Sequence, residues 1–140
     1  MFRPLCLFLA AAVFLAAAPA TPPNGSIETA MKQMSDAMKT LEKGVTPENH
    51  AACLDELGKF ETALVAAKGQ VPDAAAKVEE KKRAAFVADY RKTLIATLRL
   101  ALDAEGDIAD GKIKDADALI KNKLAAQKSA GHSKFKPEGK

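Results

Sequence analysis

The chain has 140 residues, of which 21 are Lys or Arg and 18 are Asp or Glu. Its formal net charge of +3 is too small to predict binding to nucleic acid or to an anionic membrane. Hydrophobic residues make up 48% of the chain but aromatic residues only 5%, and β-branched residues are few. This composition excludes simple disorder and argues against a sheet protein, so we expect one small helical domain.

The first 20 residues have the pattern of a secretion signal peptide. Arg3 precedes an uncharged apolar run from Leu5 to Ala18, and Ala18-Pro19-Ala20 offers the small residues that a signal peptidase reads. We therefore predict cleavage after Ala20, a periplasmic location and no membrane segment in the mature chain, with an uncleaved anchor as the alternative. Residues 21–25 are then a linker, because two prolines and a glycine in this stretch oppose helix formation.

Apolar residues recur with a helical period in four later segments of the chain, and no segment alternates with period two for long. Turn residues and caps mark the start and the end of each segment. The segments run from Ser26 to Lys43-Gly44, from Thr46-Pro47-Glu48 to Lys68-Gly69, from Pro72-Asp73 to Gly106, and from Asp110-Gly111 to Phe135. Short connections make consecutive helices antiparallel neighbours. The sequence therefore predicts an all-α fold, an antiparallel up-down-up-down four-helix bundle over residues 26–136, with a tail at 137–140.

Each segment carries one apolar stripe. The stripes are Ile27, Met31, Met34, Met38 and Leu41; Cys53, Leu57, Phe60 and Leu64; Phe86, Tyr90, Leu94, Leu98 and Leu102; and Ile113, Ala116, Ile120 and Leu124. The run from Glu79 to Arg83 is predicted to be a solvated face or a frayed helix start.

This topology brings a methionine and a histidine to one end of the bundle. Met31 lies about 8 Å from the start of the first helix, and His132 about 5 Å from the end of the fourth, so the two side chains are expected at nearly the same height. The four aromatic residues of the mature chain lie in the helix halves nearest that end: Phe60, Phe86, Tyr90 and Phe135. A thioether and an imidazole in an apolar bundle core suit the axial ligation of haem iron.

Several stretches are similar to one family. Ile27-Glu28-Thr29-Ala30-Met31 resembles the first helix of the soluble cytochrome b-562 family, and Leu57-Gly58-Lys59-Phe60 its second helix. Asp110-Gly111-Lys112-Ile113-Lys114 resembles the start of its fourth helix, and His132-Ser133-Lys134-Phe135-Lys136 the end of that helix. The resemblance covers most of residues 26–136.

The resemblance implies a periplasmic electron carrier that is not an enzyme and that binds one haem b. No Cys-x-x-Cys-His motif is present, so the haem would be non-covalent. Met31 and His132 would be the axial ligands, and the partner would be an unidentified redox protein. The pair that matches the family's helix three is either Phe86 with Tyr90 or Tyr90 with Leu94. The expected haem pocket comprises Met34, Phe60, Leu64, Phe86, Tyr90 and Leu94, in a chain expected to be a monomer.

One feature of the fourth segment departs from the family pattern. His132 follows Ile113 by 19 residues, which is about 1,900° of α-helix and leaves the two side chains about 100° apart. Leu124 and His132 have a spacing that resembles the family's, so the extra residue is expected between Ile120 and Leu124. The polar residues 121–123 could accommodate it as a π-bulge.

Two other functions are alternatives. The departure in the fourth segment favours a haem-free exported bundle that acts as an adaptor or stress-related binding protein. A divalent-metal or small-ligand binder is the other, although carboxylates and histidines are not clustered at helical spacing. His50 is expected at the end of the bundle opposite Met31, and is not predicted to be a ligand. Cys53 is predicted to be a small buried apolar residue, with an intermolecular disulfide as the alternative.

Overall fold

The computed structural model describes residues 26–135, and the regular structure in this range is helical. The elements are α1 (Ile27–Leu41), α2 (His50–Lys68), the 3₁₀ helix η1 (Asp73–Lys77), α3 (Glu80–Ala109), α4 (Ile113–Leu119), the π-helical segment η2 (Ile120–Leu124) and α5 (Ala125–Phe135). The predicted signal peptide, linker and tail, at 1–20, 21–25 and 137–140, lie outside the described residues.

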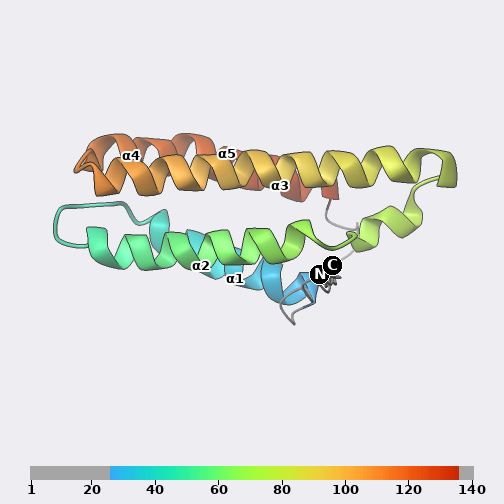
Figure 1. The fold of residues 1–140 in the computed structure, drawn as a ribbon, viewed down its shortest axis with the longest axis horizontal. Coiled ribbons are helices and arrows are strands. Elements are labelled where there is room, and N and C mark those ends of the chain that lie inside the picture. Colours follow the sequence, from blue (N-terminus) through green and yellow to red (C-terminus); the bar gives the residue numbers. More distant parts are fainter. Residues whose placement is uncertain (1–25, 136–140) are drawn as a thin grey trace, which may run out of the picture.

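The elements form four antiparallel rods, because α4, η2 and α5 follow one another without a break (Figure 1). The first two rods, α1 and α2, lie side by side in one layer, and α3 lies beside the α4–η2–α5 rod in the other. The predicted all-α four-helix bundle is confirmed. The first turns of α3 project beyond the end of the other rods, so this end of the bundle is uneven (Figure 1).

Caps at the predicted positions fix several helix ends. The Ser26 hydroxyl accepts a hydrogen bond from the backbone N–H of Thr29 at 3.2 Å and starts α1. Gly44, with φ at 111°, turns the chain after α1, and Gly111, with φ at 77°, turns it after α3. These glycines adopt the left-handed conformation that most other residues avoid, so α1 and α3 end close to them.

Two predicted helix starts are wrong. The second helix begins at His50 and not at Pro47, because the Asn49 side chain closes a turn ahead of it: Oδ1 accepts from the N–H of Thr46 at 2.7 Å, and Nδ2 donates to Gly44 O at 2.9 Å. The third α-helix begins at Glu80 and not at Pro72.

The segment that follows Pro72 is a separate 3₁₀ helix; Val78 after it is extended, and Glu79 is not helical. Arg83 stabilises this break, because its guanidinium donates to Ala75 O at 3.1 Å and to Val78 O at 3.3 Å. The charged run from Glu79 to Arg83 forms the exposed start of α3.

Two expectations for the rest of α3 are also wrong. The helix continues through Gly106 to Ala109, since one glycine weakens a helix but does not end it. The predicted stripe fails at Leu102, which is 48% exposed. A spacing of four residues rotates by about 40° per step, so the stripe turns away from the core. The buried side of α3 is formed by Tyr90, Leu94, Thr97, Ala101, Ala104 and Ile108.

One continuous core joins the four rods. The predicted stripes of α1, α2 and the fourth rod contribute most of it, and Met38, Leu41, Leu57, Leu64, Tyr90, Ile120 and Leu124 are its largest fully buried side chains. Alanines from all four rods are buried in the same core, and small side chains of this kind let a chain with few aromatic residues pack four rods together. No helix in the described part of the chain is long and apolar enough to cross a membrane.

Candidate functional site

A cavity of about 440 Å³ opens at the end of the bundle where α1 begins and α5 ends. This volume lies in the range of sites that bind cofactors and other small molecules. Side chains from all four rods line the cavity: Ile27, Glu28, Met31, Lys32, Met34, Ser35, Met38, Phe60, Leu64, Pro72, Asp73, Tyr90, Thr93, Leu94, Thr97, Gln127, Lys128, Gly131, His132 and Phe135.

The structure brings Met31 and His132 to the same cavity from the first and the last rod. Met31 is half-buried, and His132 is exposed where the cavity meets solvent. Within residues 26–135, neither the Met31 sulfur nor the His132 imidazole makes a hydrogen bond. A thioether sulfur and an imidazole nitrogen are therefore both available to a metal bound in the cavity.

The cavity wall is largely apolar, and it contains five of the six predicted pocket residues: Met34, Phe60, Leu64, Tyr90 and Leu94. Phe86 is the exception, because it is absent from the lining and packs its ring at 5.3 Å from that of Phe135. Of the two alternatives for helix three, the pair that lines the cavity is Tyr90 with Leu94.

Sequence reasoning missed several lining residues. Met38 continues the α1 stripe that contains Met31 and Met34, so its helical spacing was a usable signal. Thr97 and Gln127 are polar residues, and nothing in the pattern around them pointed to a cavity.

Tyr90 closes the inner wall of the cavity without leaving a polar atom unpaired. Its hydroxyl donates to the backbone oxygen of Ala67, near the end of α2, at 3.2 Å. Burial raises the pKa of Tyr90 to about 12, so the side chain stays neutral at physiological pH. The residue therefore presents an apolar ring to the cavity while it ties α3 to α2.

The family model for cytochrome b562 matches residues 26–136. The chain belongs to the cytochrome b562 family. A search of curated proteins gave no match. Members of this family bind non-covalent haem b and carry electrons, and they are not enzymes. The predicted family is thus confirmed.

The cavity fits the cofactor of the cytochrome b562 family. Its wall is largely apolar, and among the described residues it contains one histidine, His132 of α5, together with three methionines of α1, namely Met31, Met34 and Met38. Two charged residues of the lining form ion pairs: Lys32 with Asp36 at 2.6 Å, and Lys128 with Glu42 at 3.0 Å. A largely apolar wall that also includes charged residues suits a flat macrocycle that has a polar edge.

The fourth rod of this cytochrome b562 family member contains the irregularity that its spacing predicted. Residues Ile120–Leu124 are π-helical, and residues 121–123 within them are exposed. The π segment contains one residue more than an α-helix would need for the same rotation. The 19 steps from Ile113 to His132 therefore turn the chain about the helix axis by about as much as 18 α-helical steps, which is five full turns. This removes the excess of about 100° and accounts for the position of His132 in the cavity lining.

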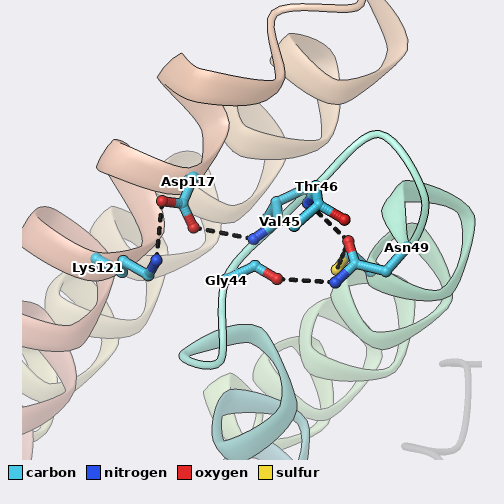
Figure 2. A network of polar contacts seen from close by, with 7 residues as sticks. Gly44, Val45, Thr46, Asn49, Asp117 and Lys121 are labelled. Carbon is cyan, nitrogen blue, oxygen red and sulfur yellow. Dashed lines mark hydrogen bonds and ion pairs between the residues drawn. The ribbon is translucent and has the colours of Figure 1, made fainter.

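A polar network holds the helical turn before the π segment (Figure 2). The backbone N–H of Val45 donates to Asp117 Oδ1 at 2.9 Å, and Lys121 Nζ donates to Asp117 Oδ2 at 2.9 Å. These bonds lower the pKa of Asp117, that from Lys121 most strongly. Gly44, beside the network, has φ at 111°, which other residues rarely adopt; a Cβ there would also lie 2.9 Å from Lys121 Nζ, a contact that the flexible lysine can relieve. The network fixes α4 to the α1–α2 connection.

The remaining histidine and the cysteine lie away from the cavity. His50 is exposed at the start of α2, with Nδ1 at 2.7 Å from Pro47 O, and Cys53 is buried one turn later. Burial raises the pKa of the Cys53 thiol. A buried thiol agrees with the predicted apolar role and not with an intermolecular disulfide. Among the described residues, no group of three or more His, Cys, Asp or Glu could hold a metal ion.

Proposed function

We propose that the protein is an exported electron carrier that holds one haem b between Met31 and His132. The observation that carries this proposal is that these two side chains, 101 positions apart in the sequence, line one apolar cavity and are free of hydrogen bonds within residues 26–135. The haem supplies a reversible one-electron iron couple when bound. With Met31 and His132 both holding the iron, the haem would have no open position for a substrate, which agrees with a carrier.

The chain's own residues would tune the site in three ways. The thioether of Met31 favours the reduced state and raises the reduction potential. Phe60, Leu64 and Leu94 exclude water from the interior of the cavity. His132 must keep its ligating nitrogen unprotonated, so acid competes with binding.

The alternative of a haem-free adaptor loses its main support. That alternative rested on the excess residue of the fourth segment, which would have turned His132 away from the bundle. The π segment at Ile120–Leu124 takes up the excess, and His132 lines the cavity.

A haemin titration of residues 21–140 tests the ligation. We expect sharp low-spin visible bands at one haem per chain, lost in both Met31→Ala and His132→Ala. The matched controls are Met34→Ala, which removes another methionine of the cavity, and His50→Ala, which removes a histidine outside it. Both controls should keep the bands. Weak bands that are indifferent to the loss of Met31 and His132 would contradict the proposal and favour the adaptor.

Export is supported by the pattern of residues 1–20 alone. Expression of the full chain in a Gram-negative bacterium should give a periplasmic product whose mass corresponds to a start at Thr21. A full-length product in the cytoplasm or the membrane fraction would contradict export without affecting the haem site.

A further inference from the structure

We propose that Phe86, although it lies outside the cavity, is a positioning residue for His132. It acts through a contact between α3 and α5 that is formed by Phe86, Asp89, Tyr90, Lys134 and Phe135, called here the α3–α5 contact. The proposal rests on the proposed function, because it concerns how the chain holds the imidazole that would ligate the iron.

The helical turn that carries His132 is weak by itself. Gly131 directly precedes the histidine, and a glycine in a helix costs about 1 kcal/mol relative to alanine. The described helix ends three residues later at Phe135, which is the only buried residue of α5. Ser133 and Lys134, between His132 and Phe135, are exposed. The direction of the imidazole therefore depends on what holds Phe135.

Two aromatic rings of α3 hold the Phe135 ring. The ring of Phe86 lies 5.3 Å from it at 66°, and the ring of Tyr90 lies 5.4 Å from it at 75°. Both are edge-to-face arrangements, which stabilise beyond simple burial. Tyr90 also lines the cavity, whereas Phe86 does not. An effect of Phe86 on the cavity must therefore pass through a neighbour, and the cavity residue whose ring Phe86 contacts edge-to-face is Phe135.

A charged pair adds to the same contact. Lys134 forms an ion pair with Asp89, and its ammonium lies 5.4 Å from the centre of the Phe135 ring. Phe86, Asp89 and Tyr90 share one face of α3, because residues three and four apart are neighbours on a helix. One turn of α3 thus contacts two consecutive residues of α5, and these begin two positions after His132.

The consequence for the site is geometric. Phe135 follows His132 by three residues, or about 300° and 4.5 Å of helix, so a rotation or fraying at Phe135 moves the imidazole directly. Without Phe86, one side of the Phe135 ring loses its partner, and the last turn of α5 opens more often. The expected result is faster loss of haem with little change in the rest of the bundle.

The test compares Phe86→Ala with Val87→Ala, a matched change at the next residue of α3, which is also half-buried. We expect haem transfer from Phe86→Ala to an excess of apomyoglobin to be about tenfold faster than from the wild type, with an intermediate rate for Phe86→Leu and an unchanged rate for Val87→Ala. Amide hydrogen exchange at residues 130–135, in both the haem-free and the haem-loaded chain, should be faster in Phe86→Ala. Exchange in α1 and α2 should not change.

Two outcomes overturn the proposal in different ways. Transfer and exchange rates of Phe86→Ala within twofold of the wild type, in a protein whose low-spin spectrum is lost with His132→Ala, would show that Phe86 does not position the histidine. A wild-type spectrum that does not depend on His132 would instead remove the proposed function and this inference with it. Circular dichroism of each variant establishes whether it is folded. If Phe86→Ala is not folded, the comparison is made with Phe86→Leu.

Discussion

Deletion of Asn122 tests whether the π segment is what directs His132 into the cavity. Asn122 is the exposed middle residue of Ile120–Leu124, and it makes no contact in the network of Asp117 and Lys121. The deletion leaves 18 α-helical steps from Ile113 to His132, or about 1,800°, which matches the rotation that the π segment produces now. The variant should keep its low-spin spectrum, and its free energy of unfolding should fall by no more than about 0.5 kcal/mol.

The opposite change supplies the control. Insertion of one alanine after Asn122 adds about 100° of rotation, which moves a Cα on a 2.3 Å helix radius by about 3.5 Å, and a rise of about 1.5 Å. Axial ligation does not tolerate a displacement of this size, so the low-spin bands should disappear while helicity persists. A folded deletion variant without low-spin bands, or an insertion variant that keeps them, would refute the reasoning.

Three further predictions concern stability and reactivity. Asp117→Ala leaves the buried N–H of Val45 without its acceptor, and urea unfolding should show a loss of about 1–2 kcal/mol; no measurable loss would contradict the network. Burial, and to a lesser degree Glu105, raise the pKa of Glu61, whose Oε1 is buried without a hydrogen bond in the described chain. Folding favours the protonated form of Glu61, so stability is lost as pH rises through the native pKa. The free energy of unfolding of Glu61→Gln should exceed that of the wild type by up to about 1 kcal/mol at pH 7 and by nothing near pH 4. An equal gain at both pH values would show that the gain does not come from the buried carboxylate. The Cys53 thiol should react with a disulfide reagent only as fast as the bundle opens, whereas immediate labelling of the native chain would mean that the thiol is accessible.

Much of the fold could be predicted because its signals are local. Ser26 bonds within its own turn, Gly44 and Gly111 meet a backbone requirement at their own positions, and the stripes of α1 and α2 follow from helical spacing. The starts of α2 and α3 could not be predicted in the same way. They depend on which partners the side chains of Asn49 and Arg83 find, and a pattern of apolar residues does not contain that choice.

The π segment illustrates how far spacing alone can reach. Counting residues from Ile113 and from Leu124 to His132 located one excess residue, and the structure places it within Ile120–Leu124. The position was predictable because the apolar residues at both ends of the fourth rod must face the same core, so the extra residue must be accommodated between them. What holds the first of those ends, the bond from Val45 to Asp117, spans 72 positions and leaves no local signal.

The wall of the site was predictable except for Phe86. Spacing indicated that Phe86 and Tyr90 share a face of α3, but it did not show where the other rods end. The first turns of α3 project beyond the other rods (Figure 1). Phe86 packs against Phe135 at the end of α5 and does not line the cavity. A residue expected to contact the cofactor thus contacts the turn that carries its histidine.

The most direct test of the central claim is X-ray absorption at the iron edge of haem-loaded residues 21–140 in the reduced state. The proposed ligation predicts one sulfur atom in the first coordination shell of iron, absent in Met31→Ala and retained in Met34→Ala. A first shell without sulfur, or a sulfur that persists when Met31 is replaced, would contradict it.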